Sequence, residues 1–337
     1  DHTSICETSH HVSGELLTEM SCKHAWAPDF ENAEYILWWG SNPLEAGFPS
    51  QTNAKRVAKS RNAGTRHVVV DPRHSRTCAF ADRWLPVRPG GDAALALAMA
   101  RQIISRGNHK VLALEAANFA AARALGSPEY EACDATYLVI VKAPTPGAEQ
   151  LFHKIGTSHA IVDKTTGAVT ALSRGIAAAA QTGRIELTGA ETAAVTAATA
   201  GLDARVVGDY VIDLGGGVYA SPVFQLYRAR VFSMTMAQYS RACGIDVATI
   251  ETVADEFAAA APACATGSYR GPAMHTNGVR AVQAVFALNV LVMNYEHKGG
   301  SSGGTGGHLH EMGGNTAGQL NLGSRYGTAA RAASGPQ

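Results

Sequence analysis

The feature that most constrains the fold is the segment 35–43, in which five bulky apolar residues lead directly into Gly40-Ser41-Asn42-Pro43. An apolar run that ends at turn-forming residues is typical of a buried strand followed by a polar loop. The pattern recurs about thirty residues later, where residues 67–70 precede Asp71-Pro72-Arg73. Two buried strands that each end in a compact polar turn predict a ligand site at the carboxyl edge of a parallel sheet.

The residues between and after these two strands predict the layers around the sheet. Residues 52–62 have helical spacing and end at Ala63-Gly64, so strand, helix and strand form a βαβ unit with a right-handed crossover. Residues 84–87 are expected to form a short third strand, and residues 93–105 an amphipathic helix. The sequence therefore predicts an α/β fold in which helices cover both faces of a parallel sheet.

Asp92 stands at the start of the last of these helices, directly after Arg88-Pro89-Gly90-Gly91. A carboxylate at this position commonly caps the helix by accepting a hydrogen bond from a backbone N–H group. An exposed carboxylate beside Pro-Gly-Gly could also accept hydrogen bonds from a purine base or a ribose. The two roles are compatible, and the residues alone leave both open for Asp92.

The rest of the chain divides into a less informative middle and a patterned end. The middle is expected to contain a helix over 111–124 and strands over 137–141 and 204–214, within an irregular insertion at about 125–230. The end is expected to contain helices and strands in the order 236–242, 247–257, 263–266 and 279–293, followed by the glycine-rich run 299–307. We expect one domain over 1–265 and part of a second α/β domain over 266–337.

Composition excludes some classes of function and bounds others. The 337 residues are 46% hydrophobic, enough for a sizeable core, and their formal net charge of zero argues against a nucleic-acid-binding surface. The six cysteines include no C-x-x-C pair, so neither a zinc ribbon nor an iron–sulfur cluster is indicated. No apolar run approaches the roughly 18 residues of a membrane span. Because the first residue is not methionine, we expect the chain to be a piece of a longer protein.

The strand-end loops point to a ligand that carries a nucleotide. Four arginines in or beside them could neutralise phosphates, namely Arg73, Arg76, Arg88 and Arg270. Asp71 and Asp92 could accept hydrogen bonds from ribose or base. A nicotinamide dehydrogenase is disfavoured, because residues 40–47 lack the G-x-G-x-x-G fingerprint and Pro43 obstructs a helix that would start at the first strand.

Three motifs together resemble the molybdopterin oxidoreductases of the dimethyl-sulfoxide-reductase type. They are Trp-Gly-Ser-Asn-Pro at 39–43, Val-Asp-Pro-Arg at 70–73 and Arg-Pro-Gly-Gly-Asp-Ala-Ala-Leu-Ala at 88–96, in the family's order and spacing. Leu288-Asn289 and Lys298-Gly299-Gly300 are similar to a later family segment. The resemblance implies a Rossmann-like domain that binds two molybdopterin guanine dinucleotides, whose dithiolene sulfurs hold molybdenum or tungsten.

The resemblance also implies which residues contact this cofactor. Gly40, Ser41 and Asn42 would line the diphosphate of one dinucleotide, and the three residues that follow the second strand would contact its ribose and phosphates. Asp92 would bind a guanine edge. The full set of implied cofactor-binding residues is Gly40, Ser41, Asn42, Asp71, Pro72, Arg73, Arg88, Gly90, Gly91, Asp92, Arg270, Gly271 and Gly300, the last three facing the pterin together with the rest of the run 299–307.

Cys6 lies about thirty residues before the first strand, where the family has its metal-binding cysteine, selenocysteine or serine. By chemistry alone, residues 4–14 are also consistent with a helix N-terminus capped by Ser or Thr. A thiolate at a helix start has a lowered pKa, and a soft thiolate suits a metal already bound by sulfur. The resemblance therefore implies that Cys6 is the catalytic metal ligand. His10 and His11 are candidates for assisting protonation of the substrate.

Within the family, the segments at 6–11 and 236–244 look most like those of tetrathionate reductases, which implies two-electron reduction of a sulfur oxyanion to give two thiosulfates. Thiosulfate, polysulfide and arsenate reductases are alternatives, as is a non-catalytic scaffold protein of the same fold. The implied partners are a small anionic substrate, a membrane anchor and an iron–sulfur electron-transfer subunit, without nucleic acid. A 4Fe-4S cluster is expected in an N-terminal domain outside this chain, and the expected location is the periplasm or the outer face of the cytoplasmic membrane.

Overall fold

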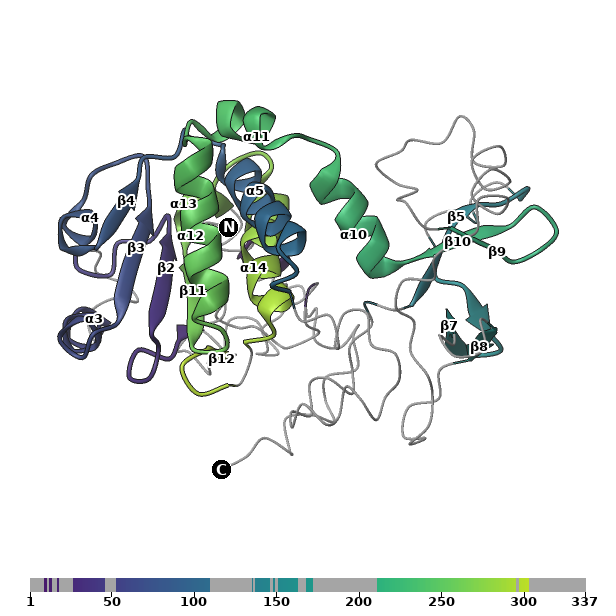
Figure 1. Ribbon diagram of the computed structural model, residues 1–337, viewed down its shortest axis with the longest axis horizontal. Coiled ribbons are helices and arrows are strands. Elements are labelled where there is room, and N and C mark those ends of the chain that lie inside the picture. Colours follow the sequence, from purple (N-terminus) through teal and green to yellow (C-terminus); the bar gives the residue numbers. More distant parts are fainter. Residues whose placement is uncertain are drawn as a thin grey trace, which may run out of the picture. The chain divides into compact units, whose positions relative to one another are not determined.

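The computed structural model describes residues 9–10, 12–13, 17, 27–45, 53–109, 135, 137–145, 148, 151–162, 168–171, 211–294 and 297–302. Its contacts divide the chain into two compact units, one comprising residues 1–108 and 236–337 and the other residues 109–235. Figure 1 labels the elements of both units. Each unit is described by itself.

The first unit is built on a four-stranded sheet in the order β11 (Cys264–Ser268), β2 (Tyr35–Trp39), β3 (Arg66–Val70) and β4 (Arg83–Leu85). All of its strand pairs are parallel. Every residue of β2 is buried, as expected for a central strand of a parallel sheet that is covered on both faces. The strands predicted at 35, 67, 84 and 263 are therefore confirmed to within a few residues.

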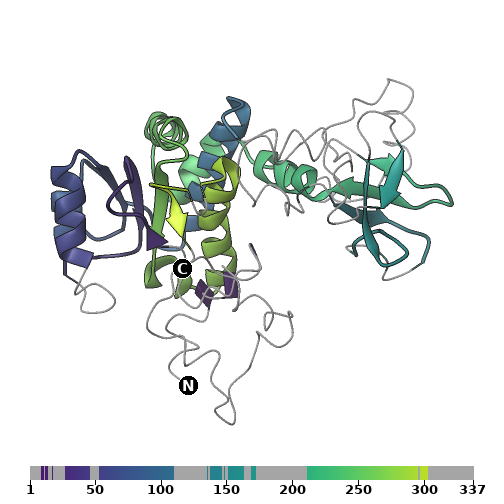
Figure 2. The same ribbon diagram turned by 90° about the horizontal axis from the view of Figure 1, so that it is seen from below.

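Helices cover both faces of this sheet, as Figures 1 and 2 show. On one face, Ile36, Trp38 and Val69 pack against Val57 and Cys78. These two residues belong to the short layer of α3 (Asn53–Asn62) and α4 (Arg76–Phe80). The other face carries α5 (Asp92–Ser105), α12 (Val247–Ala259) and α14 (Gly278–Val292). The expected α/β class with helices on both faces is confirmed.

A buried hydrogen-bond chain fixes β2 to β3. Trp38 Nε1 donates to His67 Nδ1 at 3.0 Å, and His67 Nε2 lies 3.1 Å from Ser60 Oγ, which itself donates to Val57 O at 2.9 Å. Because an indole N–H only donates, His67 must be neutral and carry its proton on Nε2. Burial lowers the pKa of His67 from 6.5 to about 4. Gly267 completes the arrangement, since a Cβ there would lie 2.6 Å from the Trp38 ring.

A second buried network fixes α14 to β11. The Asn289 side chain accepts from Thr266 N at 3.2 Å and donates to Thr266 Oγ1 at 2.6 Å. Asn294 donates to Asn289 Oδ1 at 2.9 Å and to Cys264 O at 2.6 Å. Both asparagines are fully buried. The Leu-Asn motif of this helix thus joins helix to sheet.

The second unit consists of short antiparallel pairings. One sheet joins β5 (Leu138–Lys142), β10 (Tyr219–Pro222) and β9 (Ile212–Asp213), and another joins β6 (Lys154–Ile155), β7 (Ser158–Val162) and β8 (Val169–Ala171). The strand predicted at 137–141 is confirmed by β5. Of the strand predicted at 204–214, residues 204–210 lie outside the described part, and so does the helix predicted at 111–124.

The contacts do not divide the chain after residue 265. α14 packs against α5, and β12 (Ser301–Ser302) pairs with β1 (Ala27–Pro28), so the described part of 266–302 belongs to the first unit. The reason is that β11 joins the sheet beside β2 and carries the chain directly into α14. For the described residues in the range 266–302, the contacts favour one unit with residues 1–108 over a separate domain. The expected second domain over 266–337 stays a prediction.

Two further observations concern the described residues. The cysteines among them, Cys78, Cys243 and Cys264, are reduced thiols in buried positions, which is common for this small side chain. Among the described residues, no helix is long and apolar enough to cross a membrane.

Candidate functional site

Three polar loops meet at the carboxyl edge of the sheet, where backbone hydrogen bonds join one strand end to the next. Gly40 N donates to Val70 O at 2.9 Å, and Asp71 N donates to Leu85 O at 3.1 Å. On the other side, Gly271 N donates to Gly40 O at 3.1 Å. The loops after β11, β2 and β3 are therefore adjacent, as their positions after parallel strands predicted.

Gly40 and Gly271 lie in backbone contact at this edge. A Cβ on Gly271 would be 2.4 Å from Gly40 Cα, and a Cβ on Gly40 would be 2.6 Å from Gly271 Cα. Gly40 also has φ +54°, in the left-handed region that favours glycine. Only glycine fits either position, and the two together expose bare backbone that a phosphate or a flat ring can approach closely.

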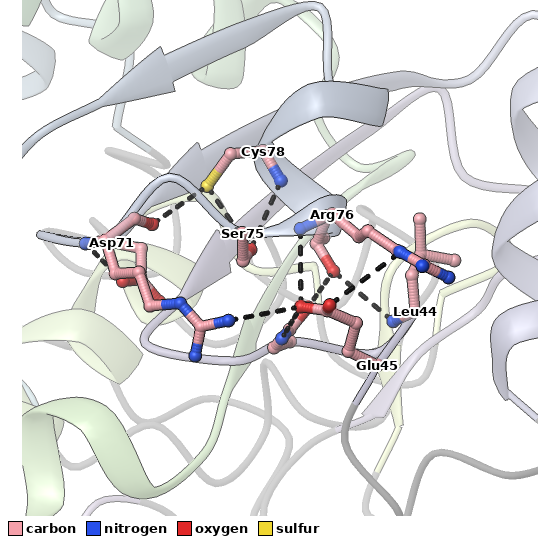
Figure 3. Close-up of polar contacts among 9 residues, drawn as sticks. Leu44, Glu45, Asp71, Ser75, Arg76 and Cys78 are labelled. Atoms are coloured by element: carbon pink, nitrogen blue, oxygen red, sulfur yellow. Dashed lines mark hydrogen bonds and ion pairs between the residues drawn. The ribbon is translucent and has the colours of Figure 1, made fainter.

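The loop after β2 is tied to α4 by side chains that Figure 3 shows from close by. The Asn42 amide accepts a hydrogen bond from Thr77 Oγ1 and donates to Glu45 Oε2 at 2.9 Å. Leu44 N donates to Thr77 Oγ1 at 3.3 Å. The Asn42 side chain thus holds two loops together, whereas the sequence predicted that it lines a diphosphate. The backbone of Gly40 and Ser41 remains at the edge.

The loop after β3 presents an arginine pair beside this network. Arg73 Nη2 lies 3.6 Å from Glu45 Oε2, and Arg76 Nε lies 3.8 Å from Glu45 Oε1. The two arginine side chains are 75% and 79% exposed, so most of their N–H donors face solvent. Asp71 accepts from Arg73 N at 2.8 Å, and partial burial raises the pKa of this carboxyl. Pro72 and Arg73 are exposed, as a ligand-binding turn requires.

The Arg-Pro-Gly-Gly loop, residues 88–91, packs against the end of α11 (Met236–Cys243). Arg88 N donates to Cys243 O at 2.8 Å, and its guanidinium donates to Arg241 O at 3.0 Å. Gly90 has φ +79°, and a Cβ on Gly91 would lie 2.9 Å from Cys243 Cα. These glycines are therefore required by the turn and by its contact with α11, whatever ligand the loop also meets.

Asp92 corrects one prediction. The sequence predicted an exposed carboxylate that caps the helix, but Asp92 is 6% exposed and is itself the first residue of α5. The predicted contact of Asp92 with a guanine edge stays a prediction. Its Oδ1 accepts a hydrogen bond from Trp39 Nε1 at 2.8 Å. Burial raises the pKa of this carboxyl, and the Trp39 hydrogen bond opposes the rise. Asp92 therefore joins the end of β2 to the start of α5.

His10 and Arg270 lie at the same edge as Gly271. The imidazole of His10 is 3% exposed and makes edge contacts with Tyr269 and Phe286, at centroid distances of 6.2 and 5.2 Å. Arg270 is exposed, with its guanidinium 5.1 Å from the Tyr269 ring. Ser13 Oγ donates to Val279 O at 2.8 Å, which ties Ser13 to the start of α14. Cys6, the predicted metal ligand, lies outside the described residues.

Gly300 lies at the opposite edge of the sheet from Gly271. Its carbonyl accepts from Asp29 N at 2.9 Å, and a Cβ on it would lie 1.9 Å from Asn294 O. The neighbouring Gly299 packs against Ala263, which precedes β11. Gly299 and Gly300 lie here because α14 runs back along the sheet and ends at the amino edge of the sheet. Gly300 therefore does not face the same edge as Gly271; residues 303–307 of the glycine-rich run lie outside the described part.

Residues 3–335 match the family model described as Molybdopterin oxidoreductase. The chain belongs to the molybdopterin oxidoreductase family. Members of this family are oxidoreductases, and membership implies molybdenum or tungsten held by molybdopterin. The family resemblance inferred from the three sequence motifs is confirmed.

Relatives of this molybdopterin oxidoreductase chain act on several oxyanions, by their names. It is 29% identical over 285 residues to a selenate reductase subunit of Mesobacillus selenatarsenatis, covering 83% of this chain and 25% of that protein. It is 28% identical over 307 residues to a tetrathionate reductase subunit of Salmonella typhimurium, covering 89% and 28%. It is 26% identical over 308 residues to the molybdopterin-containing subunit of the arsenate respiratory reductase of Chrysiogenes arsenatis, covering 90% and 26%. The chain spans about a quarter of the length of these curated relatives.

The residues at the carboxyl edge fit a phosphate-bearing part of a molybdopterin cofactor. Gly40 and Gly271 form a cradle that any Cβ would fill, and exposed guanidinium groups supply donors for phosphate oxygens. Within the described part of the chain, no three His, Cys, Asp or Glu side chains are grouped as metal ligands. The described residues thus fit the organic cofactor, and the assignment of Cys6 to the metal stays a prediction.

Sequence reasoning missed the side chains that hold the edge together. Glu45, Thr77 and the Trp39–Asp92 pair were not predicted to interact. Glu45 had a recognisable signal, because Asn-Pro-Leu-Glu has the spacing of a turn, and Glu45 N does donate to Asn42 O at 3.2 Å. The hydrogen bond between Asn42 and Thr77 had no recognisable signal in the sequence, since the two residues are 35 positions apart and meet only in the folded chain.

Proposed function

We propose that this chain is the central part of a molybdenum or tungsten bis-molybdopterin guanine dinucleotide oxidoreductase that reduces an oxyanion, with tetrathionate as its substrate. The observation that carries the proposal is the carboxyl edge, where the Gly40–Gly271 contact lies beside loops bearing exposed arginines. Backbone without side chains, together with exposed guanidinium donors, can bind phosphate groups. The three-motif resemblance supports the guanine dinucleotide form.

Each part of the edge has a role in this proposal. The Gly40–Gly271 contact lets the diphosphate approach the backbone, and Ser41 lies next to it. Arg73 neutralises phosphate charge, while Asp71 accepts a hydrogen bond from ribose. The cofactor, when bound, supplies the two-electron chemistry. Arg270 is exposed, with its guanidinium 5.1 Å from the Tyr269 ring, and can contact an anionic group.

Cys6 is proposed as the protein ligand of the metal, on the strength of the family resemblance. His10 and Ser13, which follow it closely in the sequence, contact α14 near the carboxyl edge. This placement brings the segment near Gly271. His10 is proposed as a group that assists protonation of the substrate, because it is buried at this same edge beside Tyr269.

Tetrathionate is proposed from the similarity of residues 6–11 and 236–244 to tetrathionate reductases. The alternatives are thiosulfate, polysulfide and arsenate, and the selenate reductase relative at 29% identity adds selenate. The intact protein is proposed to work with a membrane anchor and an iron–sulfur electron-transfer subunit, to carry a 4Fe-4S cluster in an N-terminal domain, and to be located in the periplasm or on the outer face of the cytoplasmic membrane.

Metal analysis combined with acid release of GMP from the full-length protein tests the proposal. Molybdenum or tungsten is expected, with GMP at about twice the molar amount of metal, because each metal would be held by two dinucleotides. A non-catalytic scaffold would contain no metal, and a nicotinamide enzyme would release no GMP. The absence of both metal and GMP would refute the proposal.

Cys6→Ala tests the proposed metal ligand in the same full-length protein. Turnover of tetrathionate with a reduced dye is expected to be lost while bound GMP is retained, since Cys6 contacts only the metal. Unchanged turnover would remove Cys6 from this role. Parallel assays with selenate, arsenate and thiosulfate identify the substrate, and a higher kcat/KM for any of them would replace tetrathionate.

A further inference from the structure

Glu45 lies between the two exposed arginines of the carboxyl edge, Arg73 and Arg76. Figure 3 shows Glu45 beside Arg76. Its two carboxylate oxygens are 3.6 Å from Arg73 Nη2 and 3.8 Å from Arg76 Nε. Neither contact is a bidentate pair, and both arginine side chains are more than 70% exposed. Ion pairs of this length and exposure are weak and easily exchanged.

Neutral donors hold the Glu45 carboxylate more firmly than the arginines do. Asn42 Nδ2 donates to it at 2.9 Å and Arg76 N at 3.4 Å, and Glu45 N donates to Asn42 O in a turn. Asn42 is itself fixed by Thr77. The carboxylate therefore keeps its place if the guanidinium groups turn to another anion.

We propose that Glu45 is a resident counter-ion of Arg73 and Arg76, which competes with the phosphate groups of an incoming nucleotide and so lowers the affinity of this edge for anions. The inference rests on the proposed nucleotide site and adds to it a residue that reduces binding. In the ligand-free chain, Glu45 limits the repulsion between the two arginines. In the complex, its negative charge stays beside the phosphates.

The size of the effect follows from the charge that a neutral replacement removes. A unit charge about 4 Å from an exposed guanidinium is worth a factor of about three to ten in affinity at low salt. Added salt screens exposed charges, so the factor falls toward one as ionic strength rises. Glu45→Gln removes the charge and keeps an oxygen that can accept from Asn42.

Titration calorimetry of GDP with the full chain tests the inference, at about 0.01 M and about 0.15 M ionic strength, where the Debye length is about 30 Å and about 8 Å. Inorganic pyrophosphate serves as a second probe that lacks the base. Glu31→Gln is the matched control, because it removes one exposed carboxylate from the loop before β2, at the amino edge. Glu45→Ala is a second variant, which loses the charge and the hydrogen bond together.

The expected result is that Glu45→Gln binds GDP and pyrophosphate about three to ten times more tightly than the unmodified chain at low salt. The gain shrinks at the higher salt, and Glu31→Gln shows none. Circular dichroism verifies that each variant is folded, and Glu45→Ala shows the same gain if Glu45→Gln does not fold. Equal or weaker binding by a folded Glu45 variant overturns the inference alone. Failure of every form to bind either probe overturns both the inference and the nucleotide site on which it rests.

Discussion

Acidification is expected to destabilise the first unit through a single buried histidine. His67 accepts a hydrogen bond from Trp38 Nε1, so a proton on His67 Nδ1 would face another N–H group. The pKa of His67 is lowered from 6.5 to about 4. Because the unfolded chain takes up this proton first as pH falls, the contribution of His67 to stability is complete above pH 6.5 and is lost toward pH 4.

The magnitude follows from the two pKa values. Their difference corresponds to about 3 kcal/mol of unfolding free energy at the acid limit, and to about 2 kcal/mol between pH 7 and pH 5. Urea unfolding at these two pH values measures the loss. His67→Asn removes the titrating group, so this variant is expected to start less stable at pH 7 and to lose about 2 kcal/mol less than the unmodified chain on acidification.

His74→Asn is the matched control, since His74 is an exposed residue of the loop after β3. It is expected to keep the pH dependence of the unmodified chain. If His67→Asn and the unmodified chain lose the same free energy between pH 7 and pH 5, then His67 is not the group that titrates. The assignment of a neutral, Nε2-protonated imidazole would then be refuted.

Substitutions at three further positions test the contacts that shape the edge and the sheet. Gly271→Ala should destabilise the chain by more than about 1 kcal/mol and weaken GDP binding, because the new Cβ would lie 2.4 Å from Gly40 Cα. Unchanged urea unfolding and an unchanged GDP titration would contradict this prediction. Asp92→Ala should lower the free energy of unfolding by about 1–3 kcal/mol, because it leaves the Trp39 N–H without its acceptor. Asp92→Asn should cost less, and it should also abolish the loss of stability with rising pH that the raised pKa of the Asp92 carboxyl causes. Equal costs for the two variants would argue against the hydrogen bond. Asn289→Ala should likewise cost about 1–3 kcal/mol, measured by urea unfolding, by leaving the Thr266 N–H unsatisfied, and an unchanged midpoint would show that the helix-to-sheet hydrogen bonds are dispensable.

The layers of the first unit were predictable because they depend on local pattern. The residues of β2 are uniformly apolar and end at glycine, and parallel strands place their loops at one edge whatever the intervening sequence. Gly40, Asp71 and Gly271 were therefore placed together correctly. Motif order and spacing were enough to identify the family.

What could not be predicted depends on tertiary contacts between distant segments. A carboxylate at a helix start is ordinarily exposed, whereas Asp92 is buried and accepts a hydrogen bond from the Trp39 indole of β2, a residue 53 positions earlier in the sequence. The position of Gly300 at the amino edge could not be predicted, because a glycine run carries no sign of its direction, and α14 sets that direction by returning to the amino edge. Glu45 and Thr77 acquire their roles from partners on a neighbouring loop.

The position of β11 in the sheet has a consequence for synthesis of the protein. β2 pairs on one side with β3, which follows it closely, but its other neighbour is encoded about 230 residues later. At about 5–20 residues per second, the ribosome leaves that edge of β2 without its partner for roughly 10–45 s. The Gly40–Gly271 contact therefore forms only after residues 1–108, the whole second unit and residues 236–271 have been made. A nucleotide that needs this contact can be retained only after translation of residue 271.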